Sequence, residues 1–387
     1  MADQHGKNLE IEALRGIAVV LAIVSHLGNL LYWTDGIEQS QVAFWGGVDI
    51  FFAISGFVIA KAFAGRVRSA RAQGKFFRGV VAFWVRRIFR IWPTAWLWII
   101  LALVMSVAFN RTAVFGTPDA NMSDLIAIVA NVSNVHFARC LDQTALLCGN
   151  NGQYWSLAVE EQFYLLFPLL VLLPRKWFGC LAALVVVGWQ SALMAMHWQS
   201  PYLYLMRVDS IFLGVSVAYF AGMASYQKWR PTWAANRFAA PLILLALLMA
   251  PVHTSEYRPY TMMVSIAGAI LVWLASYNRG YILADGTLRR VLTWIGTRSF
   301  ALYLAHNPVF LFTRELWSRI EPGTAFDHAY AVPFLATAIP LMLVLADLNY
   351  RLIESPLRRL GARLADHVEL RGLRPGPRNV SLTHGRK

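Results

Sequence analysis

EALRGIAVVLAIVSHLGNL, from Glu12 to Leu30, is a mostly aliphatic stretch long enough to cross a lipid bilayer, and it contains one arginine and one histidine. A membrane-spanning helix needs roughly 20 apolar residues. Ionisable side chains within such a helix are costly, so they usually face a cavity or a partner and indicate a functional site. Arg15 and His26 are eleven positions apart, which returns a helix to nearly the same face. We therefore expect both to face one cavity, about 16 Å apart along the helix axis.

The composition of the whole chain agrees with a membrane protein. Of its 387 residues, 57% are hydrophobic and 14% are charged, whereas soluble domains carry about a quarter charged residues. The sequence predicts an all-α, polytopic integral membrane bundle of about ten transmembrane helices. The predicted spans are residues 11–33, 42–63, 91–109, 154–173, 177–197, 208–223, 238–252, 262–277, 294–313 and 331–353.

The distribution of basic residues predicts the orientation, because cytoplasmic loops hold an excess of lysine and arginine. Of the 35 such residues, the loops predicted to lie outside hold only Arg111, Arg139, Arg258 and Arg319. Both termini are therefore predicted to be cytoplasmic. Juxtamembrane positions account for most of the net charge of +14, so we expect contact with the lipid bilayer and no nucleic-acid binding. We expect a membrane-embedded domain at residues 1–360 and a basic, flexible cytoplasmic tail at 361–387.

Polar residues in two further spans are candidates for supporting or acceptor-binding roles. GGVDIFFAISGF places Asp49 and Ser55 in the second span, and WSLAVEEQFYLLFP places Glu160 and Tyr164 one helical turn apart in the fourth. A carboxylate such as Glu160 can orient an imidazole and stabilise its cation, or it can bind a sugar hydroxyl. The alternative is a purely structural ion pair with an intramembrane arginine such as Arg207.

An arginine cluster precedes a proline in WVRRIFRIWP. Arg86, Arg87 and Arg90 lie just before Pro93, and Arg87 and Arg90 share a helical face. Guanidinium groups match phosphate oxygens, so the cluster is a candidate phosphate site. The alternative is that these charges serve topology alone.

His306 is a second candidate for chemistry, in SFALYLAHNPVF. A histidine close to a helix-disturbing proline, here Pro308, often only satisfies freed backbone groups, and we favour this structural interpretation. We also favour structural roles for Asp209 and Glu354.

Two of the three cysteines, Cys140 and Cys148, fall in the long loop predicted to be external. An oxidising compartment would allow them to form a disulfide. Eight residues apart and without a histidine pattern, they do not make a zinc signature, and we expect no metal.

Six short motifs follow one another along nearly the whole chain: ALRGIAVVLAIVSH, GGVDIFFAISGF, RRIFRIWP, WSLAVEEQFYL, LYLAH and IESP. Together they resemble the successive motifs of the acyltransferase-3 family. These are multi-spanning membrane O-acyltransferases, typified by bacterial polysaccharide and lipopolysaccharide O-acetylases.

The resemblance implies a protein of the bacterial inner membrane that takes an acyl group from cytoplasmic acyl-CoA. The group, most often acetyl from acetyl-CoA, is placed on a hydroxyl of a carbohydrate or glycolipid acceptor. The family's essential arginine and histidine of the first span match Arg15 and His26. Its donor-binding arginine motif matches the arginine cluster, and its WSLAVEEQFY motif matches Glu160.

Resemblance and helix geometry agree on a hypothesis in which Arg15, Arg87 and Arg90 hold the CoA phosphates at the cytoplasmic mouth. His26 then acts on the thioester either as a general base for the acceptor hydroxyl or as a nucleophile that forms an acyl-imidazole. Glu160 orients the histidine or stabilises its charge. Apart from the acyl-CoA substrate, no bound cofactor is expected.

Two departures from the family pattern stand out. Relatives often append a soluble hydrolase-like domain, which we do not expect in a chain of this length. His306 is followed by Asn307 and Pro308, where relatives often place an aromatic residue before the proline.

Two other classes of protein remain as alternatives. A secondary transporter or a flippase of a lipid-linked sugar or organic anion would also place arginine, histidine and carboxylates within the membrane. Such proteins often have two related halves, which this sequence does not show. A scaffold would leave Arg15, His26, Asp49 and Glu160 unexplained.

Overall fold

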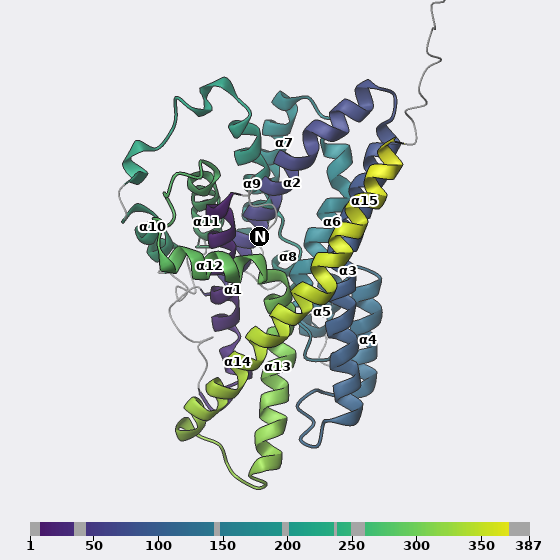
Figure 1. Cartoon of the computed structure of the whole chain (residues 1–387), viewed down its shortest axis with the longest axis vertical. Helices are drawn as coiled ribbons and strands as arrows, with labels where there is room; N and C mark the ends of the chain where they lie inside the picture. Colours follow the sequence, from purple (N-terminus) through teal and green to yellow (C-terminus); the bar gives the residue numbers. More distant parts are fainter. Residues whose placement is uncertain are drawn as a thin grey trace, which may run out of the picture.

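The computed structural model describes residues 8–34, 44–142, 148–195, 201–235, 238–248 and 260–370. Within these ranges the regular elements are all helical (Figure 1). The α-helices are α1 (Leu9–Ser25), α2 (Gly46–Ala72), α3 (Phe76–Ala108), α4 (Pro118–Val129), α5 (Ser133–Asp142), α6 (Tyr154–Leu170), α7 (Arg175–Ala195), α8 (Pro201–Leu205), α9 (Asp209–Ala221), α10 (Ala239–Leu248), α11 (Tyr260–Ser276), α12 (Thr287–Thr297), α13 (Ser299–Ile320), α14 (Ala331–Asn349) and α15 (Ser355–Leu370). The short elements that bear on the site are the 3₁₀ turn η1 (Leu27–Asn29) and the π-helical turn η6 (Tyr350–Glu354).

The predicted all-α class is confirmed, and each predicted span overlaps a helix. By length and composition, four helical stretches of the described chain can cross a membrane: Gly46–Ala72, Phe76–Ala108, Pro201–Ala221 and His328–Glu369. The number of crossings and the orientation stay predictions.

The predicted domain boundary between residues 360 and 361 falls inside α15, because that helix continues to Leu370. The rest of the predicted tail, residues 371–387, lies outside the described residues. So do the ends of the predicted spans 42–63, 177–197 and 238–252.

Helices α4, α5 and α12 lie where the sequence predicted loops, or only the beginning of a span. Helices α4 and α5 fall between the third and fourth predicted spans, and α12 precedes α13. Thr117 caps α4, since its side chain accepts a hydrogen bond from the backbone N–H of Ala120, and Pro118 stands at the helix start. All three helices are shorter than a bilayer-spanning segment, so a search for apolar runs of that length passes over them.

Small residues allow two pairs of helices to cross with their backbones in contact. Helix α12 crosses α1 at Gly16 and Gly296, where added Cβ atoms would collide with the carbonyls of Leu292 and Glu12 respectively. Helix α9 crosses α2 in the same way at Gly56 and Gly214. Close approach through small residues is a common way for helices to associate in membranes, where lipid supplies no hydrophobic driving force between them. The crossings fix α1 and α2, which carry much of the site.

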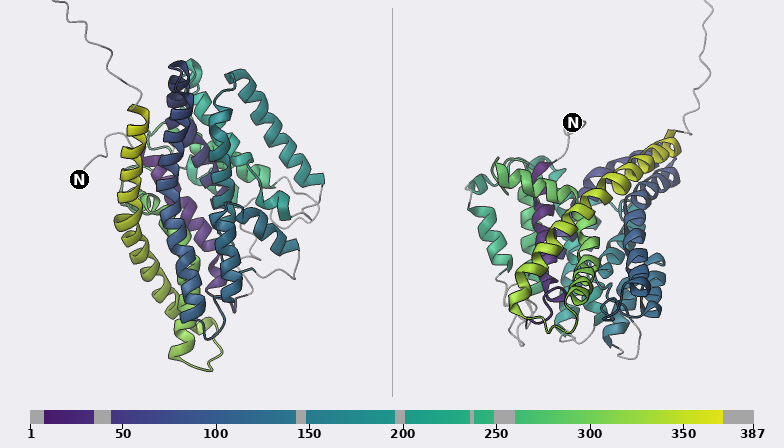
Figure 2. Two further views of the ribbon diagram at one scale, coloured as in Figure 1. Left: turned by 90° about the vertical axis from the view of Figure 1, so that its right-hand side faces the viewer. Right: turned by 60° about the horizontal axis from the view of Figure 1, so that its bottom comes forward.

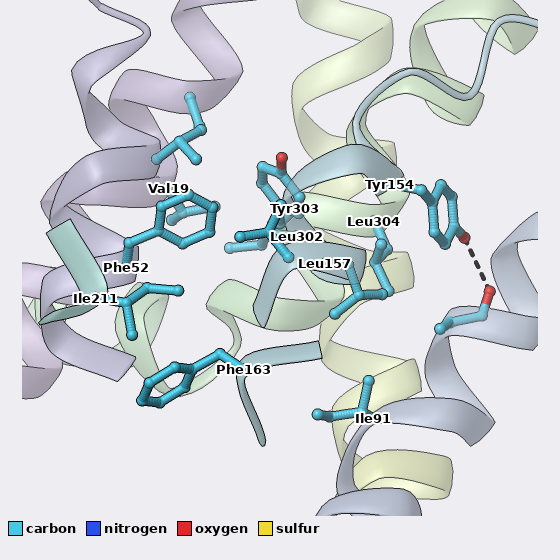
Figure 3. Packing of buried hydrophobic residues seen from close by; sticks show 14 of the residues in the cluster. Val19, Phe52, Ile91, Tyr154, Leu157, Phe163, Ile211, Leu302, Tyr303 and Leu304 are labelled. Carbon is cyan, nitrogen blue, oxygen red and sulfur yellow. Dashed lines mark hydrogen bonds between the residues drawn. The ribbon is translucent and has the colours of Figure 1, made fainter. Parts of the chain in front are cut away.

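The main hydrophobic core joins α1, α2, α3, α6, α9 and α13 (Figure 3). Phe52, Phe163 and Ile211 pack on one side of it, and Leu157, Leu302 and Leu304 lie closer to Tyr154. The hydroxyl of Tyr154 donates a hydrogen bond to the carbonyl of Ala95, 2.8 Å away, and so satisfies the only polar side-chain atom of that buried residue. Helices α1, α6 and α13 are thereby held around one centre.

Helices α14 and α15 form one long rod interrupted by the π-helical turn η6, and α15 lies along α3 (Figures 1 and 2). Arg86 of α3 holds α15 through ion pairs with Asp366 at 2.6 Å and Glu369 at 2.9 Å. The π-helical turn carries the buried residue Glu354. Such turns inside long helices are frequently found at functional sites.

Candidate functional site

Two histidines meet near the centre of the bundle. The rings of His26 and His306 lie with their centroids 4.9 Å apart. His26 is the C-cap that follows the last residue of α1, Ser25, and His306 is a fully buried residue of α13. The sequence placed them 280 positions apart, and the fold brings them into one centre.

Hydrogen bonds define which ring nitrogens can react. His26 Nδ1 lies 2.7 Å from the carbonyl oxygen of Ala22, which can only accept, so in the neutral ring Nδ1 carries the proton and Nε2 is the basic atom. His306 Nδ1 bonds the carbonyl of Tyr303 in the same way. The buried His306 Nε2 has no hydrogen-bond partner among the described residues.

A cavity of about 650 Å³, which we call the Arg314 cavity, adjoins His26. Its lining is rich in amides and aromatic rings and includes both cysteines of α5 and the following loop. The residues used below are Ser25, His26, Asn29, Trp45, Asn150, Gln153, Trp155, Tyr204, Arg207, Asn307 and Arg314.

A chain of amides forms one wall of the Arg314 cavity. Asn29 Nδ2 donates to Asn307 Oδ1 at 2.9 Å, Asn307 donates to the carbonyl of Asn150, and Asn150 Nδ2 donates to the carbonyl of Val114 at 2.7 Å. The chain connects the end of α1, helix α13 and the loop before α6. Asn307 stands where relatives often have an aromatic residue. Its side-chain amide here joins η1, through Asn29, to the loop before α6, through Asn150.

A second cavity of about 80 Å³, the Arg15 cavity, lies on the other side of Val48, which lines both. Arg15, Arg90, Glu160 and Tyr303 are among its lining residues. Tyr303 also closes the boundary toward the Arg314 cavity, because its hydroxyl donates to the carbonyl of Gln153 at 3.0 Å.

Glu160 is the centre of a polar cluster in the Arg15 cavity. Ser55 and Tyr164 both donate hydrogen bonds to its Oε1. Arg90 and Arg15 are among its nearest charged neighbours. The fold thus brings Ser55 of α2 against Glu160 and Tyr164 of α6.

A third cavity of about 310 Å³, the Glu354 cavity, shares Arg15, Arg90, Ser299 and Phe300 with the Arg15 cavity. It is further lined by Glu354 and by the cationic residues Lys61 and Arg358. Glu354 Oε2 is buried without a hydrogen-bond partner in the part of the chain that the structure describes. The sequence favoured a structural role for Glu354 and gave no sign that this side chain lines a cavity with several charged residues.

The expectation that Arg15 and His26 face one cavity is wrong. Arg15 lines the Arg15 and Glu354 cavities, whereas His26 lines the Arg314 cavity. The two residues are separated along the helix axis: Arg15 lies in the first half of α1, whereas His26 is the C-cap that follows Ser25, about 16 Å away.

The predicted phosphate cluster divides into two kinds of arginine. Arg90 lines two cavities together with Arg15. Arg86 is engaged by Asp366 and Glu369 of α15. Arg87 lies over the rings of Phe63 at 5.0 Å and Tyr164 at 5.7 Å and lines none of the three cavities. Sequence spacing could not reveal which arginine already had a partner within the protein.

The expected partnership between Glu160 and His26 also takes another form. The described hydrogen bonds of Glu160 go to Ser55 and Tyr164, and Glu160 lines a different cavity from His26. The ring that packs against His26 is that of His306. His306 therefore contacts the candidate catalytic histidine, which the structural role favoured from the sequence did not anticipate.

Asp49, rather than Glu160, is the partner of Arg207. The two buried side chains form an ion pair at 2.9 Å, and Ser210 donates to the other carboxylate oxygen of Asp49 at 2.8 Å. Ser265 and Asp209 continue this buried network. Asp49 thus holds Arg207 at the wall of the Arg314 cavity.

Cys140 and Cys148 form a disulfide at the rim of the Arg314 cavity. His136 lies close to both sulfurs, but its Nε2 is 2.9 Å from Asp124 Oδ1. Burial raises the pKa of Asp124, and hydrogen bonds from Asn151, His136 and the backbone of Gly149 act against that shift. In the disulfide the two sulfurs are bonded to each other and are not thiolate ligands.

Several residues of the site escaped the sequence-based prediction, namely Asn29, Tyr303, Asn307 as a wall residue, Arg314 and Glu354 as a cavity residue. The sequence marks most of these residues only weakly, because amide and tyrosine side chains occur in many apolar segments that have no functional site. Arg314 directly follows the predicted span 294–313, so it could have been noted as a cation at the edge of a span. The residues beside it in the sequence gave no indication of a cavity.

The described chain is thus an all-helical bundle with buried ionisable groups and a histidine pair, and four of its helical stretches are long and apolar enough to cross a membrane. The family model described as an acyltransferase domain matches residues 8–348. The chain therefore belongs to the acyltransferase-3 family.

The relatives are similar along most of this chain. It is 26% identical over 375 residues to the peptidoglycan O-acetyltransferase OatA of Listeria monocytogenes, covering 91% of this chain and 56% of that protein. It is 26% identical over 383 residues to the O-acetyltransferase OatA of Staphylococcus aureus, covering 91% of this chain and 57% of that protein. The chain thus spans about half the length of these curated relatives. No solved structure matches it.

Proposed function

We propose that this chain is a multi-pass membrane O-acyltransferase that moves an acetyl group from acyl-CoA to a hydroxyl of a carbohydrate at the cell surface. The observation that carries the proposal is the pair of His26 and His306, whose rings are in contact, with His26 lining one of two unlike kinds of cavity. One kind is lined by arginines and carboxylates, and the other by amides and aromatic rings. The named activity of the relatives supports the class of reaction.

The Glu354 and Arg15 cavities are the proposed donor side. Arg15 and Arg90 line both, so a phosphate or pyrophosphate at the mouth would be held by paired guanidinium groups. The predicted cytoplasmic location of the N-terminal end of α1 puts this mouth on the side where acyl-CoA is found. The pantetheine arm would then extend past Val48 and Tyr303 toward the histidines.

The chemistry proposed for His26 uses the basic Nε2. As a general base it accepts the proton of the acceptor hydroxyl while the oxygen attacks the thioester carbonyl. The C–O bond forms, the C–S bond breaks, and the CoA thiolate leaves and is protonated. As a nucleophile, Nε2 would first form the N–C bond as the C–S bond breaks and the CoA thiolate leaves. The acceptor oxygen would then attack the acyl-imidazolium, the N–C bond would break, and the hydroxyl proton would pass to the freed Nε2 and on to the thiolate or to water. His306 packs against the His26 ring and positions it in either case.

The Arg314 cavity is the proposed acceptor side. Amide side chains offer both donors and acceptors to hydroxyl groups, and the rings of Trp45, Trp155 and Tyr204 offer flat apolar surfaces. A carbohydrate or a glycolipid headgroup presents both kinds of surface. The relatives named peptidoglycan O-acetyltransferases make a cell-wall glycan the first acceptor to test.

The test uses purified full-length chain in liposomes with acetyl-CoA labelled on the acetyl group. Thiol release and transfer of label to cell-wall oligosaccharide are measured for wild type, His26→Gln and the control His328→Gln, whose histidine lies in the 3₁₀ turn His328–Tyr330. We expect transfer by wild type and by His328→Gln, and a loss of roughly 10²- to 10⁴-fold in His26→Gln. If wild type releases no thiol with any oligosaccharide, the acyltransferase proposal fails, and solute transport becomes the function to measure.

A further inference from the structure

Arg314 of α13 differs from the other arginines of its helix and helix start. Arg298 pairs with Asp347 at 2.5 Å, and Arg319 pairs with Glu315 at 2.8 Å. Arg314 has no carboxylate partner among the described residues. Its Nη1 donates to the carbonyl of Asn29 at 3.1 Å, and its guanidinium lies 4.3 Å from the ring centroid of Tyr32. It is a half-buried cation whose charge is balanced by no acid that the structure describes.

The described lining of the Arg314 cavity likewise contains more cationic than anionic side chains. Among its described lining residues there is no aspartate or glutamate, while Arg207, Arg314 and His26 are all present. Arg207 has its counter-charge in Asp49. Placing a cation in a partly enclosed site without a counter-ion is unfavourable, so a retained cation of this kind is best explained by an anion that arrives with a ligand.

We propose that the Arg314 cavity takes a carbohydrate that bears an anionic group, and that Arg314 binds that group. This inference rests on the proposed function, because it assigns the cavity to the acceptor of the acyl transfer. A guanidinium fork matches the two oxygens of a carboxylate or of a phosphate, so either anion fits the chemistry. The amide chain from Asn29 through Asn307 to Asn150 and the aromatic rings then contact the uncharged part of the sugar.

The position of Arg314 limits where the anionic group lies on the acceptor. His306 and Arg314 are eight residues apart on α13, about 12 Å along the helix axis. Helical side chains lean toward the N-terminus, which here brings the guanidinium back toward His306. The anionic group therefore lies on the acylated sugar unit or on the unit next to it, and not at a distant point of a polymer.

The experiment compares three acceptors of equal length in the liposome assay with full-length protein. One is a neutral oligomer of N-acetylglucosamine. The second alternates N-acetylglucosamine with N-acetylmuramic acid and so carries carboxylates, and the third is the neutral oligomer bearing a phosphate. The variants are Arg314→Gln, Arg314→Lys and the control Arg319→Gln, whose arginine is engaged by Glu315 outside the cavity.

We expect wild type to prefer one of the anionic acceptors, and which one it prefers identifies the anion. Arg314→Gln should raise KM for that acceptor roughly ten- to hundred-fold, the effect of losing a hydrogen bond to a charged group. KM for the neutral oligomer and for acetyl-CoA should not change. Arg314→Lys should recover part of the preference, and Arg319→Gln should behave as wild type.

A purely structural role for Arg314, such as binding the end of the turn η1, predicts another result. In that case Arg314→Gln would weaken transfer to all three acceptors equally, or to none, and either outcome overturns the inference. So would a wild type that uses neutral and anionic oligomers equally well. These results leave the acyltransferase proposal intact, whereas a wild type that releases no thiol from acetyl-CoA with any acceptor removes both.

Discussion

The Arg15 and Glu354 cavities differ from the Arg314 cavity, which His26 lines, in the kinds of side chain that surround them. On the Arg15 side, guanidinium groups and carboxylates lie together, as Arg15, Arg90, Glu160 and Glu354 show. On the Arg314 side the space is larger, and the described lining has cations, amides and aromatic rings but no carboxylate. The first arrangement suits the phosphates of the proposed donor, and the second suits a bulky ligand with many hydroxyl groups.

The comparison also shows how one helix serves both sides. Helix α1 presents Arg15 from its first turns to the donor side, and it ends where His26 meets the acceptor side. Its crossing with α12 at Gly16 and Gly296 fixes it near Arg15, and the contact between His26 and His306 fixes the other end. Changes on one side should therefore affect one substrate, and changes at the centre should affect both.

The largest effect is expected at the centre. His306→Leu removes the ring that packs against His26 while keeping an apolar side chain of suitable size at a fully buried position. We expect acetyl transfer to fall about 100-fold or more, with little change in either KM, because both substrates still bind. The thermal unfolding midpoint separates this from misfolding. A variant that unfolds as wild type and keeps full activity would show that His306 is structural.

An intermediate effect is expected on the donor side alone. Arg15→Gln removes one of the two guanidinium groups shared by the Glu354 and Arg15 cavities. We expect KM for acetyl-CoA to rise roughly 10-fold, as for the loss of a charge-assisted hydrogen bond, while KM for the acceptor stays the same. The measurement is a pair of saturation curves, one for each substrate. A larger change in the acceptor curve would contradict the division of the cavities.

The sequence predicted the helical class and the overlap of apolar segments with helices, because an apolar run leaves a strong local signal. The polar residues that it proposed for the site stay a prediction, made because an ionisable group within an apolar run is also conspicuous. The meeting of Ser55, Glu160 and Tyr164 was consistent with that set. What failed were inferences about partners, since a partner far along the chain leaves no signal at the residue itself.

Two cases show the physical reason. Periodicity placed Arg15 and His26 on one face of a helix, but a shared face does not show whether the space beside it is one cavity or several, because the other helices that divide that space leave no signal in α1. The charge pattern grouped Arg86 with Arg90, but only the packing of α15 along α3 shows that Arg86 already has two carboxylate partners.

The smallest effect is expected at Arg86, and it tests that last distinction. Asp366 and Glu369 are at least partly exposed, so these ion pairs are screened and contribute roughly 1 kcal/mol or less. Arg86→Gln should lower the thermal unfolding midpoint slightly and leave KM for acetyl-CoA within about twofold of wild type, in contrast to Arg15→Gln. The matched variant Asp366→Asn should lower the midpoint similarly, because it breaks one of the same pairs from the other side. A rise in KM at Arg86 as large as that at Arg15 would mean that α15 releases Arg86 when the donor binds. The separation between a donor-binding arginine and a helix-holding one would then fail.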